Sequence, residues 1–171
     1  MKKEEARKSK QDRIVSTETA QGMAAHLLRR SVQICVALFL DQMQAYAITP
    51  VQYAALVTIH DHPGLDQGRL GAISSIDRST IGGAVQRLEA RGLVQRRLSP
   101  EDQRVKQAFI TPAGRELLRK TRQDLDLVQE RLFAPLTANE QDTLLALLAK
   151  LVGAHGSLTH STEQTRDSEA L

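Results

Sequence analysis

Seven basic side chains lie between residues 77 and 106, where they could bind a polyanion. Only four acidic residues share this segment, and the whole chain carries 23 basic and 20 acidic residues, for a net charge of +3. A single exposed arginine usually belongs to a solvated surface. Seven cationic groups on adjoining elements instead favour contact with phosphates. The seven are Arg78, Arg87, Arg91, Arg96, Arg97, Arg104 and Lys106.

Two adjacent glycines, Gly82 and Gly83, lie within a segment that otherwise predicts a helix. Asp77 is a favourable N-cap, and Gly92 is a favourable residue for the chain to leave the helix. Each interior glycine disfavours a helix by about 1 kcal/mol relative to alanine, so the pair requires a reason. The apolar stripe of this helix consists of Ile81, Ala84, Val85 and Leu88. Because the glycines lie on or beside the opposite face, either another helix packs closely there or a ligand or nucleic acid approaches the backbone.

The neighbouring segments predict the elements that position this helix. Thr49 and Pro50 are typical of a helix start, and Asp66 is a suitable cap for a short second helix. After the glycine-containing helix, residues 93–98 and 105–111 favour two β-strands around a polar turn. Helix, short helix, helix and hairpin is the order of a winged helix-turn-helix. In that arrangement the second helix of the pair enters the DNA major groove, and the hairpin lies along the backbone or minor groove.

Longer helices are predicted on both sides of this central part, over residues 19–46 and 112–153. They contain more leucine than the winged helix-turn-helix at 49–111 can cover, so we expect them to form a dimerisation lobe. The basic segment 1–18 predicts a disordered arm, and the polar segment 154–171 predicts a disordered tail. The expected fold class is mostly α with a small β-wing.

Length and composition restrict the class of protein further. A chain of 171 residues with 41% hydrophobic and 25% charged residues is typical of one globular domain. Its single cysteine cannot form an intrachain disulfide, and the basic start has no apolar core of the kind a signal peptide needs. No apolar run reaches the roughly 18 residues of a membrane span, so we expect a cytoplasmic protein that does not enter membranes. Catalytic and phosphate-binding motifs such as G-x-S-x-G and the P-loop are missing from the sequence, which predicts no enzyme and no cofactor.

The segment DRSTIGGAVQRLEARGLVQRRLSPEDQRVKQAFITPAGREL resembles the recognition helix and wing of the MarR (multiple antibiotic resistance regulator) family. LEARGLV, DQR and TPAGREL are the most specific parts of the resemblance, which extends in element order over residues 19–153. It implies a homodimer that binds double-stranded DNA at a pseudo-palindromic operator. Members of the family mostly repress transcription and release DNA when a small, often phenolic or aromatic molecule binds between the two lobes.

The resemblance also assigns roles to individual residues. Arg104 corresponds to the wing-tip arginine that enters the minor groove, and Asp102 corresponds to the acidic residue that orients it. Ser79, Thr80 and Gln86 correspond to groove and phosphate contacts on the recognition helix. Many members carry bulkier polar side chains in place of the two glycines, which leaves open how this chain would read an operator. The predicted DNA contacts are Arg78, Ser79, Thr80, Gly82, Gly83, Gln86, Arg87, Arg97, Asp102, Arg104 and Lys106.

For the small molecule, we expect an aromatic acid or its coenzyme A thioester. Arg29 or Arg30 could pair with a carboxylate, while Tyr46, Tyr53 and His60 could flank an aromatic ring. Each of these five is equally compatible with an ordinary surface or core-edge position.

Two alternatives concern other residue types. Cys35 could sense oxidants, since one branch of the family uses a cysteine in the first helix, but its apolar neighbours favour an inert core thiol. His60 and His62, with His26, could bind a metal, although residues two apart on a helix diverge, and histidines satisfied by carbonyls at a helix end are favoured. A winged-helix adaptor for other proteins is the remaining alternative, and it would not need the arginines.

Overall fold

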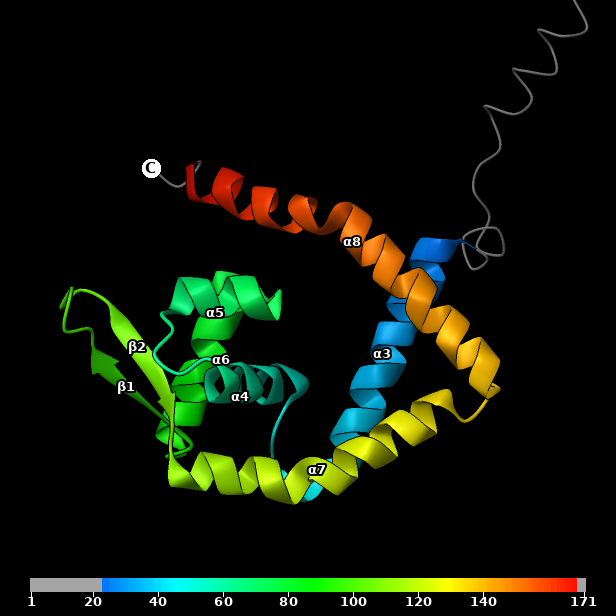
Figure 1. The fold of residues 1–171 in the computed structure, drawn as a ribbon, viewed down its shortest axis with the longest axis horizontal. Helices are drawn as coiled ribbons and strands as arrows, with labels where there is room; N and C mark the ends of the chain where they lie inside the picture. The colour runs from blue at the N-terminus through cyan, green and yellow to red at the C-terminus, as the bar shows by residue number, and fades with distance from the viewer. Residues whose placement is uncertain (1–22, 169–171) are drawn as a thin grey trace, which may run out of the picture. The chain divides into compact units, whose positions relative to one another are not determined.

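The computed structural model describes residues 23–168, and the predicted basic arm at 1–18 lies outside these described residues. Its elements are α3 (Ala24–Gln42), the 3-10 turn η1 (Gln44–Tyr46), α4 (Pro50–Asp61), α5 (Gln67–Ser74), α6 (Arg78–Ala90), β1 (Val94–Leu98), β2 (Lys106–Ile110), α7 (Pro112–Phe133) and α8 (Ala138–Ser168) (Figure 1). The chain divides into two units, 1–37 and 38–171, and the boundary falls inside α3. The grouping of α3, α7 and α8 into one dimerisation lobe therefore stays a prediction.

Local hydrogen bonds fix where four helices of the second unit begin. Each of the predicted N-caps Thr49, Asp66 and Asp77 accepts a hydrogen bond from the backbone N–H three residues later, and Thr111 does the same before the predicted helix that starts at residue 112. At Thr49 the bond is reciprocated, because the side chain of Gln52 accepts from the backbone N–H of Thr49. These four helix starts are confirmed.

The apolar faces of α4, α5 and α6 meet in one core. In α6 the predicted stripe is buried, with Ile81, Ala84 and Leu88 at 0% exposure and Val85 at 4%. Helix α4 contributes Ala55, Leu56 and Ile59, each at 0% exposure, and α5 contributes Leu70. Burial of this face, rather than helix propensity, holds α6 in place despite its two glycines.

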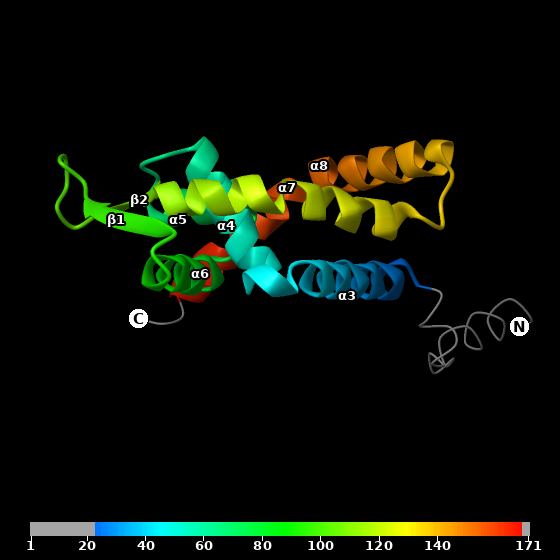
Figure 2. The same cartoon turned by 90° about the horizontal axis from the view of Figure 1, so that it is seen from below.

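The two strands form an antiparallel hairpin, and their pairing runs from Val94 opposite Ile110 to Leu98 opposite Lys106. Strand β1 begins one residue later than predicted, and β2 is one residue shorter than predicted at each end. Leu65, in the loop between α4 and α5, forms an additional bridge to Ala108 of β2. The turn of the hairpin extends away from α4, α5 and α6 in both views (Figures 1 and 2). The element order and the hairpin confirm the mostly helical fold with a small β-wing.

Helix α7 begins tightly against the hairpin because residue 114 is a glycine. A Cβ atom at Gly114 would lie 2.7 Å from Cγ1 of Ile110 and still closer to the carbonyl oxygen of Leu93. The backbone there has no room to move away, since Thr111 donates from its backbone N–H to the same carbonyl at 3.1 Å. Gly114 therefore sets the distance between α7 and the wing.

Helix α8 differs from the prediction at its end, because it continues to Ser168, through most of the segment expected to be a disordered tail. Its described side chains include apolar residues with high exposure: Leu144, Leu145, Leu147, Leu151 and Val152. Among the described residues, no helix combines the length and the hydropathy needed to cross a bilayer.

Candidate nucleic-acid interface

The first turn of α6 is organised by the carboxylate of Asp77. Its Oδ1 atom accepts hydrogen bonds from the Ser79 hydroxyl at 2.6 Å and from the Thr80 backbone N–H at 2.9 Å. These bonds lower the pKa of Asp77 from 3.8 to about 2. The negative charge also faces the positive end of the helix dipole. Because the Ser79 hydroxyl already donates its hydrogen to Asp77, it can only accept a hydrogen bond from DNA.

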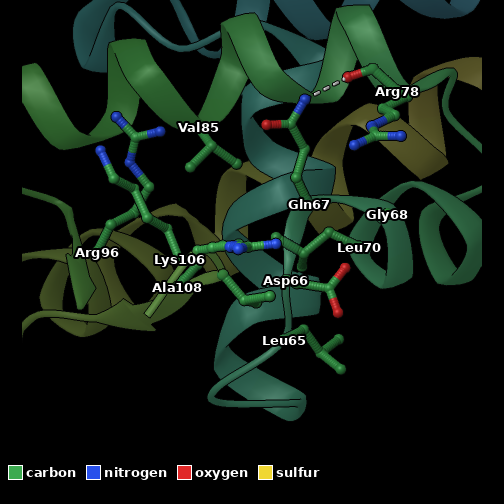
Figure 3. Close-up of a pocket in the computed structure, with 12 residues that line it drawn as sticks. Leu65, Asp66, Gln67, Gly68, Leu70, Arg78, Val85, Arg96, Lys106 and Ala108 are labelled. Atoms are coloured by element: carbon green, nitrogen blue, oxygen red, sulfur yellow. Dashed lines mark hydrogen bonds between the residues drawn. The ribbon is translucent and has the colours of Figure 1, made fainter. Parts of the chain in front are cut away.

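The structure distinguishes the two glycines of α6. A Cβ atom at Gly82 would lie 2.9 Å from Cδ of Gln67 and still closer to its Nε2. The Nε2 atom of Gln67 donates to the carbonyl of Arg78 at 2.9 Å (Figure 3). Gly82 thus makes room for a side chain of α5, which supports the packing interpretation at this position. The sequence pattern of a single helix could not predict the contact between Gln67 and Gly82, because this contact joins two helices.

Gly83 is in a different environment. A Cβ atom there would meet nothing closer than Nη1 of Arg87, at an ordinary contact distance of 3.5 Å. Packing within the described residues therefore does not require a glycine at position 83. The close-approach interpretation stays a prediction for Gly83, as does the DNA contact predicted for Gly82.

Arg96 and Arg91, from the group of seven basic residues, make hydrogen bonds to partners inside the protein. Arg96 donates through Nε to Oε2 of Glu89 at 2.8 Å, and this ion pair lowers the pKa of Glu89. Arg91 donates through its two terminal nitrogens to the carbonyls of Tyr46 and Ala47, at 2.8 and 2.7 Å. As a group the seven cations favour contact with phosphates, but these two guanidinium groups, which are not among the predicted DNA contacts, have internal partners.

The wing carries three exposed basic residues in ordered positions. The guanidinium of Arg97 lies over the ring of Phe109, 5.2 Å from its centroid, in a cation–π contact. In the turn, Asp102 accepts a hydrogen bond from the backbone N–H of Arg104 at 2.9 Å. Asp102 thus orders the backbone that carries Arg104, whereas we expected it to orient the guanidinium. Lys106 is exposed at the start of β2.

A pocket of about 320 Å³ lies between the wing and the starts of α5 and α6. In Figure 3, Arg96 and Lys106 reach it from the hairpin, Arg78 from α6, and Gln67 from α5. Arg104 also lines it, and Asp66 is the one acidic residue among its lining residues. A concave surface lined by Arg78, Arg104 and Lys106, beside the ion-paired Arg96, can accommodate an anionic group such as a phosphate. Arg78 of α6 and Arg104 and Lys106 of the wing, three of the predicted DNA contacts, therefore line one pocket.

Comparison with known proteins identifies the family. The HTH-type transcriptional repressor NicR of Pseudomonas putida is 33% identical over 127 residues, which are 74% of this chain and 80% of NicR. A sequence model of the MarR family matches residues 48–106, the segment that holds the candidate interface. This chain belongs to the MarR family. The chain is therefore a transcriptional regulator of the MarR type.

Solved structures of MarR-type regulators agree with the fold. The transcriptional repressor CouR, bound to a 23-mer DNA duplex, superposes with a TM-score of 0.73 at 25% identity, over 80% of this chain and 97% of CouR. BpsR of Bordetella bronchiseptica superposes with a TM-score of 0.72 at 27% identity, over 77% of this chain and 94% of BpsR. The BpsR structure concerns regulation of DNA binding by 6-hydroxynicotinic acid.

The five residues predicted to bind an effector have separate partners in this MarR-family chain. In the first unit, Arg29 lies 3.4 Å from His26, and Arg30 donates to Gln33. In the second unit, the hydroxyl of Tyr46 donates to Asp124 at 2.6 Å. The remaining two contacts are the edge-on packing of Tyr53 against Phe39, with ring centroids 5.6 Å apart, and the 2.8 Å approach of His60 to Asp61. Their assignment to an effector site stays a prediction.

The cysteine and the histidines complete the description of the candidate residues. Cys35 is half-buried on α3, so it is not one of the core side chains that we expected. Nδ1 of His60 contacts the carboxylate of Asp61 rather than a backbone carbonyl. Among the residues that the structure describes, no three His, Cys, Asp or Glu side chains form a group that could hold a metal ion.

Proposed function

We propose that this MarR-family chain is a homodimeric repressor that a small aromatic acid or its coenzyme A thioester releases from a pseudo-palindromic operator. The observation that carries the proposal is the pocket that basic residues of α6 and the wing line together. Two relatives support it: NicR is a transcriptional repressor, and the DNA binding of BpsR is regulated by 6-hydroxynicotinic acid.

In the proposed complex, the start of α6 enters the major groove. Ser79, Thr80 and Gln86 are exposed near this end of the helix or on its outer face. Gln86 is suited to bidentate contact with adenine, and Ser79 can accept a hydrogen bond from a base or a bound water. Gly83 allows the helix backbone to come close to the bases. Gly82 and the side-chain amide of Gln67, which lies next to it, form part of the same DNA-facing surface.

The wing and the flanking arginines supply contacts to the DNA backbone and minor groove. Arg104 at the tip enters the minor groove, while Asp102 keeps the turn in the conformation that presents it. Arg97 and Lys106 approach phosphates from the hairpin, and Arg78 and Arg87 approach them from α6. Phosphate contacts of this kind fix register, whereas the residues of α6 provide sequence readout.

The effector would act through geometry. In a dimer, two recognition helices can bind successive major grooves only if they are about 34 Å apart. A ligand that binds better to a dimer with a different spacing lowers operator affinity by its differential affinity for the two states. Arg29 or Arg30 would pair with the carboxylate of the ligand, and Tyr46, Tyr53 and His60 would surround its ring.

The test begins with selection of duplexes from a random library by the wild-type protein. We expect enrichment of a pseudo-palindrome that binds at least a hundredfold more tightly than its scrambled version at the same salt concentration. Titration with 6-hydroxynicotinic acid, other aromatic acids and their coenzyme A thioesters should then identify a compound that weakens binding of the selected duplex. Equal affinity for selected and scrambled duplexes would reject the proposal in favour of a protein-interaction adaptor.

A further inference from the structure

The C-terminal end of the recognition helix is tied to a distant turn of the chain. Arg91 is the C-cap residue of α6, and its guanidinium donates to two successive carbonyls of the η1 turn, those of Tyr46 and Ala47. The partners are 45 and 44 residues apart in the sequence. Ala47 ends η1 in the left-handed conformation, at φ 48°, which directs the two carbonyls toward the same donor group. A planar guanidinium can satisfy both carbonyls at once, which an ammonium group cannot do with comparable geometry.

The η1 turn is bonded in turn to α7, and the same residue of α7 also accepts a hydrogen bond from the end of α3. The hydroxyl of Tyr46 donates to Oδ2 of Asp124 on α7 at 2.6 Å, and the side-chain amide of Gln42, at the end of α3, donates to Oδ1 at 2.7 Å. Both oxygens of Asp124 are therefore occupied, and the bonds from Tyr46 and Gln42 lower the pKa of this carboxyl. A continuous series of hydrogen bonds thus leads from α6 through η1 to α7 and the end of α3.

Because this connection holds the C-terminal end of α6, a small change in it would displace the N-terminal end of the helix. Helix α6 has 13 residues, so it is about 20 Å long. Its apolar stripe packs on α4 and α5, whereas Arg91 connects its far end to η1 and α7. A rotation of about 10° at that end displaces the other end of such a helix by about 3 Å, which is close to the rise of one base pair.

We infer that Arg91 is a positioning residue for DNA binding. Through Tyr46 and Asp124, it sets the orientation of the recognition helix relative to α7, and therefore the fit of two recognition helices to two half-sites. This inference rests on the proposed function, since it concerns a dimer on a pseudo-palindromic site.

The experiment compares two duplexes with Arg91→Met and Arg91→Lys variants of the full chain. One duplex is the palindrome that the wild-type protein selects, and the other holds a single half-site of it next to a scrambled half. We expect Arg91→Met to weaken binding of the palindrome about tenfold and binding of the half-site less than about twofold. Because Arg91 is not assigned a phosphate contact, the dependence of affinity on salt concentration should not change. Arg91→Lys, which keeps the charge but has a single donor nitrogen, should restore part of the loss.

Tyr46→Phe provides a second test that does not depend on the tolerance of position 91. This substitution keeps the ring and removes only the hydroxyl that bonds Asp124, so it should also weaken the palindrome and spare the half-site. Because both changes interrupt one series of bonds, their effects in the double variant should be less than additive.

Three results would overturn the inference. Arg91→Met could lose affinity equally for both duplexes with a smaller salt dependence, or it could leave the affinity for the palindrome unchanged. Tyr46→Phe could leave the ratio of palindrome affinity to half-site affinity unchanged. The first would make Arg91 a phosphate contact. The wild-type arm is read separately, since a wild-type protein that selects no palindrome contradicts the proposed function itself.

Discussion

At the scale of single residues, the two glycines of α6 make different predictions. Gly83→Ala introduces no contact closer than 3.5 Å, so it should stabilise the helix by up to about 1 kcal/mol through its lower unfolded-state entropy. Gly82→Ala would displace the amide of Gln67 from the carbonyl of Arg78, and it should gain less. Thermal unfolding of the two variants, measured side by side, tests this order.

Gly83→Ala also separates packing from DNA approach. If the bare backbone at Gly83 lies against the bases, Gly83→Ala should weaken binding of the selected duplex about tenfold while its melting temperature rises. Normal affinity together with higher stability would show that DNA does not approach this position. Gly153→Ala serves as the matched control, because Gly153 is a glycine of α8 whose added Cβ would meet nothing within 4 Å, so the helix should gain stability while DNA affinity stays unchanged.

Arg104 makes the most specific prediction for the wing. Its guanidinium is carried by a turn that Asp102 orders, so Arg104→Ala should remove the proposed DNA contact without disturbing the hairpin. We expect operator affinity to fall by about 1–3 kcal/mol, with an unchanged dimer and melting temperature. Arg119→Ala is the control, since Arg119 is an exposed arginine on α7 that pairs with Glu116. An unchanged affinity for Arg104→Ala at fixed salt would remove the wing tip from the interface.

At the scale of elements, the stability that the capped start of α6 gives to the fold should depend on pH. Folding lowers the pKa of Asp77 from 3.8 to about 2, so the ionised carboxylate stabilises the folded state fully above about pH 4. This contribution is lost as the pH falls toward 2, where the folded protein also takes up the proton. Wild type should therefore be more stable than Asp77→Ala at pH 7, and the difference should shrink between pH 4 and pH 2.

Urea unfolding at several pH values measures this difference. Asp126→Ala, which removes an exposed acidic residue of α7, is the control for general charge effects. A difference between wild type and Asp77→Ala that stays constant from pH 7 to pH 3 would mean that the cap does not depend on the charge of Asp77.

Helix starts and the wing could be predicted because the interactions that define them are local. Asp77 reaches an N–H three residues away, and the alternation of side chains that favours a hairpin lies within the hairpin itself. The partners of Arg91 and Gln67 could not be predicted in this way, because they lie on other elements. Arginine spacing alone therefore overstated the cationic surface, since it cannot tell a guanidinium that caps a carbonyl from one that faces solvent.

At the scale of the whole molecule, the exposed apolar side chains of α8 require an explanation. Leu147 and Leu151 are 56% and 50% exposed, and Leu144 is 38% exposed. Residues three, four and seven apart lie on one face of a helix, so these leucines form a continuous apolar stripe. A stripe of this kind on a monomer marks an association surface, and a second copy of the chain is the partner that the proposed function requires.

Leu147→Glu combined with Leu151→Glu should therefore abolish dimerisation. Two charges on the stripe would be desolvated in the interface without partners, whereas in the monomer they remain in water. Light scattering should show twice the 18.9 kDa of a single chain for wild type and one chain for the variant. Affinity for the palindrome should fall about a hundredfold through loss of the second recognition helix.

Ile73→Glu is the matched control, because Ile73 is also 50% exposed but lies on α5. The mass of this variant should remain that of the dimer. A double variant that stays dimeric would exclude this face of α8 from the interface, and a monomeric wild type would reject the homodimer.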